Sequence, residues 1–598
     1  MMHISLWHTL LYAVAIAAGC RIASRAYRKA RRLDVSIELL VTVAIGGALL
    51  IGELTEAAAV GVLFILGEHL EARALRRTRE ALSSLMDLLP EKAVVLKDGV
   101  PIEVPPAEVR IGDVLLIRDG ARVPVDGEVI KGRASINESP ITGESLPAEK
   151  VPGSMVYAGG LGLSGTLWIR AEQVGGETAL ARIVRRVEVA QEQKATIERF
   201  IDRFARWYTP AAGALAVLVL LFTHRMEAAL TLLVIACPGA LVISTPAAVM
   251  AGIGRAAQLG ILIKGGAHLE NASAISVLAF DKTGTLTEGR PRLTNIVPLK
   301  PSASDPEEAG AGWTSAQQDV LRWAAVAEAG SAHPLAQPIV REATMCGRLP
   351  CAEPSRTRAG RGVEASCASH SVAVGTLELM HEIEAAVPST TASILQGFEH
   401  DGKTAVVAAL DGRAIGVLAA ADECRESARS MLEQVRAAGV NRIVMLTGDG
   451  RRTAEALARR LDIPEVHAGL LPATKLELVR RMQAQGGIVA MVGDGINDAP
   501  AMAAADVSIA MGSGAASLAI ETADIVILKN DLRKIPDAIR IARATRRNMR
   551  QNIVIAMVTV AGLFVGVLTG SVHMATGMLI HELSVLMVTL NAVRLLRA

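Results

Sequence analysis

Long hydrophobic stretches alternate with polar blocks along this chain of 598 residues, a pattern typical of membrane proteins with large water-exposed domains. Each stretch is long enough for an α-helix to cross a hydrocarbon core of about 30 Å. The second and third are joined so closely that they predict a helical hairpin. The predicted spans are residues 4–22, 36–52, 54–72, 205–223, 228–250, 553–570 and 574–592.

Arginine-rich segments orient these helices. Basic clusters at 21–32 and 73–79 follow the first and third stretches, and such clusters favour the cytoplasmic side. The polar blocks 73–200 and 255–548 then lie in the cytoplasm, with the N-terminus outside and the C-terminus inside. The first stretch could instead be a signal peptide. It lacks a basic start and a small-residue cleavage site, so we favour an anchor.

Composition narrows the class of protein further. The chain is 51% hydrophobic, and its net charge of +2 gives no field that would attract nucleic acid. Aromatic residues make up only 3% of the chain, which argues against stacking platforms for bases. The six cysteines are scattered without a Cys-x-x-Cys pair, so we predict neither a disulfide framework nor a thiolate metal clip.

The first polar block, 73–200, predicts a small and mostly β domain. Short apolar runs at 94–96, 114–117 and 129–130 are separated by glycine-containing turns. A Thr-Gly-Glu-Ser turn over 142–145 exposes the carboxylate of Glu144 on a bend that glycine permits. Taken alone, this turn would be an ordinary surface loop.

The second polar block, 255–548, alternates strands and helices. Apolar runs at 275–280, 443–446 and 488–492 predict buried parallel strands, and each is followed by aspartates. Strand ends of such sheets gather ligands and reacting groups, and several carboxylates at one edge suit a Mg²⁺-phosphate site. A carboxylate there can act as a nucleophile toward the terminal phosphoryl group of ATP. The polar residues concerned are Asp281, Thr447, Asp449, Lys475, Asp494 and Asp498.

An insertion over roughly 290–405 interrupts this block. It contains Glu328, His333 before a proline, and the pair Gly360 and Gly362, which would let backbone approach a ligand closely. A lone histidine of this kind is ordinarily a capping or core residue.

Together these motifs resemble the P-type ATPases, and specifically their heavy-metal-transporting (P1B) branch. Asp281–Thr285, Thr142–Ser145, Thr447–Asp449 and Gly493–Asp498 stand in the family's order and spacing, and Ser331–Pro334 with Gly360–Gly362 is similar to its nucleotide-domain signature. The resemblance implies a multidomain chain with an α-helical transmembrane bundle. It also implies an α/β, haloacid-dehalogenase-like (Rossmann-type) phosphorylation domain, an α+β nucleotide-binding domain and a mostly β actuator domain.

The implied boundaries follow the same order. They are 1–75 for an anchor and hairpin, 76–200 for the actuator domain, 201–254 for two spans, 255–290 and 409–547 for the phosphorylation domain, 291–408 for the nucleotide-binding domain and 548–598 for the last two spans.

The resemblance also implies roles for the polar residues. Asp281 would be the phosphorylated nucleophile, Lys475 would neutralise the transferred phosphoryl group, and Thr447 and Asp449 would contact its oxygens. Asp494 and the Thr283 carbonyl would hold Mg²⁺ beside Asp281, with Asp498 supporting the loop. Glu144 would orient the hydrolytic water. ATP would be held by Glu328, His333, Gly360 and Gly362.

The cargo site is expected where a helix is interrupted in mid-membrane. Pro238 removes a backbone donor from the span 228–250, and the preceding Cys237 offers a soft ligand. A packed, inert cysteine is the alternative. Gly239 stands where many metal pumps have a second cysteine, which weakens a Cu⁺ assignment because Cu⁺ favours sulfur-only sites.

The last span adds His581 and Glu582, an imidazole and a carboxylate suited to Zn²⁺ or Co²⁺, with Cd²⁺, Fe²⁺ and Mn²⁺ as further candidates. The pair resembles the His-Glu-Gly motif of the cobalt/zinc-like pumps, with Leu583 in place of glycine. Val560 stands where the zinc/cadmium/lead pumps have lysine. Glu56 is a candidate for the exit path.

These features imply an ATP-driven exporter of a divalent transition metal in a prokaryotic inner membrane, functional as a monomer and with no nucleic-acid partner. A pump for Cu⁺ or K⁺, a membrane-anchored phosphatase of the same hydrolase superfamily and a metal-sensing receptor without turnover are the competing interpretations.

Overall fold

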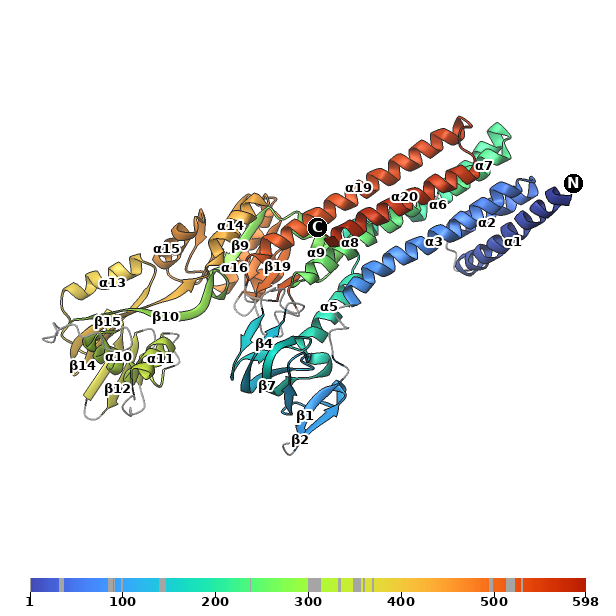
Figure 1. Ribbon diagram of the computed structural model, residues 1–598. Helices are drawn as coiled ribbons and strands as arrows, with labels where there is room; N and C mark the ends of the chain where they lie inside the picture. Colours follow the sequence, from blue (N-terminus) through green and yellow to red (C-terminus); the bar gives the residue numbers. More distant parts are fainter. Residues whose placement is uncertain are drawn as a thin grey trace. The chain divides into compact units, whose positions relative to one another are not determined.

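The computed structural model describes the chain apart from residues 1, 32–36, 84–89, 91, 98–99, 139–146, 237, 300–312, 332–334, 348–355, 359–360, 368–369, 494–497, 512–521, 529–530 and 598. The chain divides into two compact units (Figure 1). Unit 1 comprises Met1–Ala274, Asp524–Lys529 and Pro536–Ala598, and unit 2 comprises Ile275–Ala523 and Asn530–Ile535.

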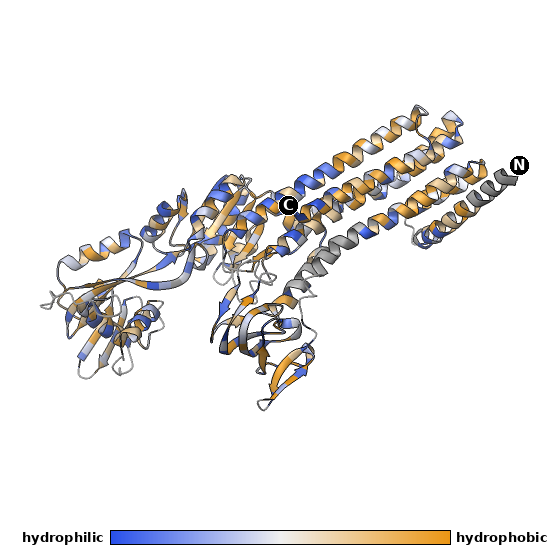
Figure 2. Ribbon diagram, viewed as in Figure 1, coloured by the Kyte–Doolittle hydropathy of each residue, from blue (hydrophilic) through white to orange (hydrophobic). Residues whose placement is uncertain are grey.

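The predicted spans all coincide with helices of unit 1. Figure 2 colours most of their described residues as hydrophobic, whereas the first half of α19 is hydrophilic. By length and composition, four helical stretches of the described chain can cross a membrane, Thr196–Thr223, Met226–Gln258, Lys534–Leu568 and Met574–Arg597. The helices are α1 (Met2–Ala30), α2 (Ile37–Leu50), α3 (Leu54–Ser83), α6 (Thr196–Thr223), α7 (Met226–Ile235), α8 (Gly239–Gln258), α19 (Lys534–Leu568) and α20 (Met574–Val593).

The block between α3 and α6 folds as the predicted mostly β domain. Its strands are β1 (Ala93–Lys97), β2 (Val100–Val104), β3 (Val114–Ile117), β4 (Asp126–Asn137), β5 (Ala148–Lys150), β6 (Met155–Val156) and β7 (Leu161–Gln173), followed by α5 (Ala179–Glu192). They pair in the order β2-β1-β3-β7-β4-β5, with β6 on β4. Every pairing is antiparallel, and alternate side chains such as Leu115, Leu167 and Ile169 form the core.

Unit 2 contains a parallel sheet in the order β17-β16-β9-β18-β19. Its central strands are buried along their length and read as continuous apolar runs, as expected for a sheet covered on both faces. The strands are β9 (Val277–Asp281), β16 (Arg442–Leu446), β17 (Glu465–His467), β18 (Val489–Gly493) and β19 (Val507–Met511). The helices of this part are α14 (Ser427–Ala437), α15 (Arg451–Leu461), α16 (Pro472–Ala484) and α17 (Ala499–Ala504).

The insertion forms a second, antiparallel sheet in the order β10-β15-β14-β13-β12-β11. Its strands are β10 (Thr287–Pro298), β11 (Arg356–Arg358), β12 (Gly362–Cys367), β13 (His370–Gly375), β14 (Thr404–Leu410) and β15 (Arg413–Cys424). The accompanying helices are α10 (Ser315–Glu328), α11 (Ala336–Cys346), α12 (Leu377–Glu382) and α13 (Thr390–His400).

Two predicted boundaries differ from the elements of the structure. The boundary between 408 and 409 cuts the β14–β15 hairpin, and because β15 pairs with β10 this sheet extends to Cys424. Residues 255–274 carry the end of α8, β8 (Ile261–Ile263) and α9 (Gly266–Ser273), and their assignment to the phosphorylation domain stays a prediction. The last membrane segment was expected from 548, but its helix α19 already begins at Lys534.

The insertion sheet depends on a close approach between two glycines. Gly362 on β12 pairs with Gly375 on β13 and has a φ of 151°, which side chains rarely adopt. A methyl group on Gly362 would lie 2.2 Å from the carbonyl oxygen of Val374. Only a residue without a side chain fits this position. Gly362 therefore has a structural role in the sheet in addition to its predicted role in binding the nucleotide.

Gly362→Ala is therefore expected to destabilise the full-length protein by about 1–3 kcal/mol through backbone strain. The measurement is the thermal unfolding midpoint of the purified chain. Gly397→Ala is the matched control, because no atom lies within 4 Å of the added methyl group in helix α13. The control should be neutral or slightly stabilising. Equal midpoints for the two variants would contradict the proposed strain.

Candidate functional site

The polar residues predicted at one sheet edge are brought there by strand register. Asp281 is the last residue of β9 and lies opposite Leu446 of β16, while Phe280 lies opposite Val492 of β18. Because the three strands are parallel, the loops that follow them all begin at the same edge. Thr447 and Asp498 therefore lie in loops that begin beside Asp281, although more than 160 residues separate them from it in sequence.

Lys475 joins two of the carboxylates. Its Nζ atom lies 2.6 Å from Asp281 Oδ1 and 2.6 Å from Asp498 Oδ1, and all three residues are buried. Burial by itself lowers the pKa of the Lys475 ammonium. The two carboxylates outweigh burial and hold this pKa above its ordinary value. The ammonium thus stays charged next to Asp281, a position from which it can stabilise negative charge that develops there.

Carboxylate oxygens at this edge fit a magnesium ion. Asp498 Oδ2 is buried and has no hydrogen-bond partner within the described residues, so one oxygen remains available for a ligand. Oxygen donors of this kind are those that Mg²⁺ prefers. The side chain of Thr283 is exposed, which leaves its backbone carbonyl as the predicted ligand. Asp494 lies outside the described residues.

The loop after Asp281 is held by an arginine that the sequence motifs did not reveal. Arg425 donates from Nε to the Thr285 carbonyl at 2.9 Å and from Nη2 to the Gly284 carbonyl at 3.0 Å. Gly284 itself has a φ of 72°, which favours glycine. Since Arg425 follows β15, its position depends on the insertion sheet, and no local pattern could have identified it.

Thr447 and Asp449 form the next part of the edge. Thr447 is buried, and its Oγ1 accepts the backbone N–H of Asp449 at 3.1 Å, which fixes the turn. The Asp449 carboxylate forms an ion pair with Lys282, the residue that follows Asp281. The structure therefore links the loops after β9 and β16 directly.

The predicted nucleotide residues are only partly described. Glu328 ends α10 and is buried next to an apolar core that includes Ala327. Gly362 begins β12, whereas His333 and Gly360 lie outside the described residues. Glu144 also lies outside them. At the base of its loop, Glu138 pairs with Lys150 at 2.9 Å, and both side chains are buried.

The predicted interruption of the fifth span is present. Helix α7 ends at Ile235 and α8 begins at Gly239, with Pro238 as the residue before the second helix. Cys237 lies between them, outside the described residues. The structure thus provides a break in the helix but does not place the thiol.

His581 lies level with this break. Helix α20 packs against both α7 and α8. Earlier along α20, Met578 belongs to the same apolar cluster as Val234 of α7, and later along it Val585 belongs to the same cluster as Leu241 of α8. On α20, His581 lies between Met578 and Val585. The break between α7 and α8 likewise lies between Val234 and Leu241, which puts the histidine and the break at the same level. The histidine is 3% exposed, and no hydrogen bond or ion pair to its ring is found among the described residues.

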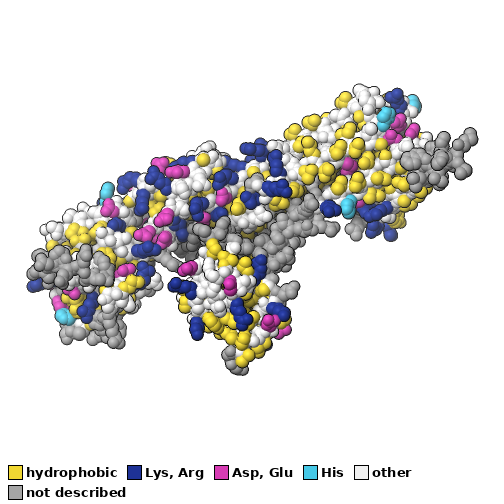
Figure 3. Space-filling view, viewed as in Figure 1, with side chains coloured by type: hydrophobic (Ala, Val, Ile, Leu, Met, Phe, Trp, Pro, Cys, Tyr) yellow, Lys and Arg dark blue, Asp and Glu magenta, His cyan; other side chains and the backbone are white. Residues whose placement is uncertain are grey.

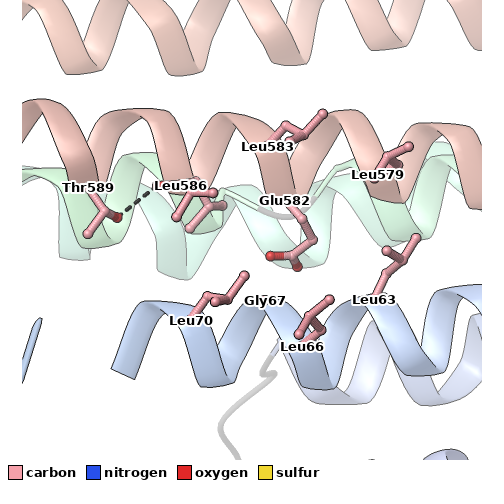
Figure 4. Close-up of a pocket in the computed structure, with 10 residues that line it drawn as sticks. Leu63, Leu66, Gly67, Leu70, Leu579, Glu582, Leu583, Leu586 and Thr589 are labelled. Carbon is pink, nitrogen blue, oxygen red and sulfur yellow. Dashed lines mark hydrogen bonds between the residues drawn. The ribbon is translucent and has the colours of Figure 1, made fainter. Parts of the chain in front are cut away.

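Glu582 points in another direction, because successive residues of a helix are rotated by about 100°. Its carboxylate packs against α3, where a methyl group on Gly67 would lie 1.8 Å from Glu582 Oε2. Figure 4 shows Glu582 between α20 and α3, surrounded by leucines. It lines an apolar cavity of about 100 Å³ to which His581 does not contribute. The two residues predicted as one ligand pair therefore lie on different faces of α20.

Two hydroxyl groups near the break have no hydrogen-bond partner within the described residues. Ser584 follows His581 by three positions on α20, and Thr245 lies on α8. Both are buried, and α8 and α20 pack together. The sequence motifs did not single out Ser584, although its spacing from His581 places both residues on the same side of the helix.

Glu56, a residue predicted to line the exit path, forms a hydrogen bond with the backbone of another helix. Its Oε2 accepts the backbone N–H of Ala575 in the first turn of α20. A carboxylate at a helix N-terminus satisfies an unpaired donor and is favoured by the helix dipole.

The family models match both units. A model described as haloacid dehalogenase-like hydrolase matches residues 275–506, and one described as P-type ATPase actuator domain matches residues 87–188. The second match coincides with the β1–β7 domain, and the first contains the antiparallel sheet of unit 2 and strands β9, β16, β17 and β18 of its parallel sheet.

Similar proteins extend over almost the entire chain. The zinc/cadmium/lead-transporting P-type ATPase of Escherichia coli (strain K12) is 41% identical over 597 residues, which cover 98% of this chain and 78% of that protein. The copper-exporting P-type ATPase of Bacillus subtilis (strain 168) is 39% identical over 502 residues, covering 82% and 61%. A crystal structure of a zinc-transporting PIB-type ATPase in the E2·Pi state is 40% identical, with a TM-score of 0.61 over 99% of this chain and 95% of that chain.

The central ion pair of the site leads to a stability prediction. Lys475→Met leaves two buried carboxylates without their cation, a change that typically costs about 3–5 kcal/mol. The thermal midpoint of the detergent-solubilised chain should therefore fall. Asp498→Asn added to this variant should recover part of the loss, because one of the two charges is then removed. Lys403→Met is the control, since Lys403 is partly exposed and its partners among the described residues, Asn295 and the ring of Phe398, are neutral. If Lys475→Met and Asp498→Asn changed the thermal midpoint additively, the proposed coupling between the ammonium and the carboxylate would be contradicted.

Proposed function

The chain belongs to the heavy-metal-transporting P-type ATPases, and we propose that it exports a divalent transition metal ion, Zn²⁺ or Co²⁺ first, from the cytoplasm. It is an ion-transporting ATPase with a haloacid-dehalogenase-like domain and several membrane helices. The cargo, the transport site and the role of each residue are the proposal. A prokaryotic inner membrane and a monomer are the setting that fits it.

Asp281 is the nucleophile of this proposal. A carboxylate oxygen of Asp281 attacks the terminal phosphorus of ATP, the bond to the bridging oxygen breaks, and ADP leaves. Lys475, at 2.6 Å from Asp281, neutralises the phosphoryl charge, and Thr447 and Asp449 orient its oxygens. Asp281, Asp494 and the Thr283 carbonyl, supported by Asp498, would hold Mg²⁺, which supplies further positive charge when bound.

Nucleotide binding and dephosphorylation involve the two remaining motifs. Glu328, His333, Gly360 and Gly362 hold the adenine nucleotide. Glu144 orients the water that attacks the aspartyl-phosphate, so that the P–O bond to Asp281 breaks and inorganic phosphate leaves. Both assignments rest on the match of these residues to the family's motifs.

The cargo site is proposed around the break between α7 and α8. The observation that carries it is His581, which is buried level with that break and has no hydrogen-bond partner among the described residues. Buried polar groups are ordinarily hydrogen-bonded, so an imidazole without a partner is available as a ligand. Cys237 would supply a thiolate, and Thr245 and Ser584 add hydroxyl oxygens.

This donor set favours a divalent metal over copper(I). A site of nitrogen, oxygen and at most one sulfur suits Zn²⁺ or Co²⁺, with Cd²⁺, Fe²⁺ and Mn²⁺ as further candidates, whereas Cu⁺ favours sulfur ligands. The similarity to a zinc/cadmium/lead transporter agrees with zinc, and the similarity to a copper exporter makes Cu⁺ the main competitor. Cobalt rests on the His-Glu motif alone. Glu582 places a carboxylate on another face of α20, against α3, and is not a direct partner of His581.

Phosphoenzyme labelling tests the chemistry. With radiolabelled ATP, Asp281→Asn should abolish acid-stable phosphoenzyme, because an amide cannot replace the nucleophilic carboxylate. Glu144→Gln should instead increase the steady-state level, since formation continues while hydrolysis slows. Persistent labelling of Asp281→Asn would assign the nucleophile to another residue.

Metal-stimulated ATPase activity tests the cargo site. Purified protein assayed with Zn²⁺, Co²⁺, Cd²⁺, Mn²⁺, Fe²⁺, Cu⁺ and K⁺ should respond most strongly to Zn²⁺ or Co²⁺. His581→Ala and Cys237→Ala should each abolish the response while ATP binding persists. His573→Ala is the matched control, since it removes an exposed imidazole from the start of the same helix.

The outcomes separate the alternatives. Wild-type stimulation in both His581→Ala and Cys237→Ala would refute the proposed site, and stimulation by Cu⁺ alone would identify a copper pump. ATPase activity without response to any cation would favour the phosphatase interpretation.

A further inference from the structure

A groove runs along the surface of unit 1 between α19 and α20. It has a volume of about 520 Å³, and its lining includes Arg547, Arg550, Val554, Ile555, Met587 and Asn591. Arginines line one end and apolar side chains the other. Figure 3 shows Lys and Arg side chains gathered along the first half of α19, next to a hydrophobic field over the rest of the helix.

The groove lies where α19 enters the membrane. After Arg550, residues 551–568 contain no charged side chain. Eighteen helical residues extend about 27 Å, close to the thickness of a bilayer core. Arg550 therefore lies at the level of the lipid headgroups, and Val554 and Met587, 59% and 58% exposed, face the acyl chains. The cytoplasmic orientation follows from the basic flanks.

The two arginines of the groove are available for a ligand. Both side chains are exposed, and neither forms an ion pair with any described residue. Two earlier arginines on the same helix differ, because Arg540 pairs with Asp537 and Arg543 donates to the carbonyl of Ser273 at 3.3 Å. Guanidinium groups bind phosphate oxygens with charge-assisted, often bidentate hydrogen bonds.

The groove is held open by a polar bridge between its two helices. Asn591 donates to Asn552 at 2.8 Å and to Gln551 at 3.4 Å, and Asn548 donates to the Asn591 carbonyl at 2.8 Å. Asn548 and Asn552 are buried, so the bridge is protected from water. This contact fixes the spacing of α19 and α20 before any ligand arrives, which reduces the cost of ordering on binding.

We propose that the groove binds one anionic phospholipid of the cytoplasmic leaflet. Arg547 and Arg550 hold its headgroup phosphate, and an acyl chain lies over Val554, Ile555 and Met587. Free phosphate would use only the arginines and leave the apolar part of the groove in water or bulk lipid. A phospholipid suits both ends of the groove, because its phosphate binds the arginines and its acyl chain contacts the apolar side chains. An anionic headgroup also balances the positive charge of the two arginines.

Lipid binding can be measured on the full chain in nanodiscs. Phosphatidylcholine discs containing a minority of phosphatidylglycerol should yield protein that retains phosphatidylglycerol in native mass spectrometry. The double variant Arg547→Gln/Arg550→Gln should lose this preference by roughly thirtyfold, as expected for two basic residues at an anionic surface. Arg594→Gln/Arg597→Gln removes the same charge near the same membrane face but outside the groove, and should keep it.

Further arms identify the ligand and check the fold. Val554→Trp fills the apolar end without changing charge and should also weaken lipid retention, whereas added inorganic phosphate should not displace the lipid. Metal-stimulated ATPase activity in the same discs verifies that each variant is folded. Equal loss in the two arginine pairs, or displacement by inorganic phosphate, would overturn the proposal in favour of diffuse attraction or a free-anion site.

Discussion

The ion pair of Lys475 with Asp281 and Asp498 is the interaction on which the arrangement of unit 2 depends. Two buried carboxylates repel each other strongly at low dielectric. The shared ammonium offsets this repulsion and allows the two groups to lie close together. The ammonium reaches them because α16 begins close to the edge where β9, β16 and β18 end. The contact that we propose for catalysis is thus also one on which the stability of the fold depends.

The membrane imposes a second constraint. A helix can be interrupted in the bilayer only where neighbouring protein covers the freed backbone groups, and the residues around Pro238 are buried by α3, α6 and α20. The same packing buries His581 at that level. Glu582, one position later, necessarily faces α3, where only the absence of a side chain at Gly67 leaves room for its carboxylate. Helical geometry thus separates two residues that sequence places together.

Much of this architecture was predictable from periodicity. The apolar runs at 275–280, 443–446 and 488–492 became parallel strands, and the hydrophobic stretches became helices. Boundaries were less predictable, since the break at 408 cuts the β14–β15 hairpin, and β15 also pairs with the distant strand β10. Arg425 could not be found either, because its hydrogen bonds to the Asp281 loop span 140 residues and follow no local pattern.

By itself, the sequence determined the motif in which Asp281 stands, the alternation of membrane and polar segments and the position of the helix break, because motifs and hydrophobic runs are local properties of the chain. The tertiary structure decided which of these residues meet. It joined Lys475 to both carboxylates, separated Glu582 from His581, directed Glu56 to the start of α20 and left Arg547 and Arg550 beside an apolar groove without an ion-pair partner among the described residues. Such contacts depend on the packing of distant elements, which no local pattern encodes.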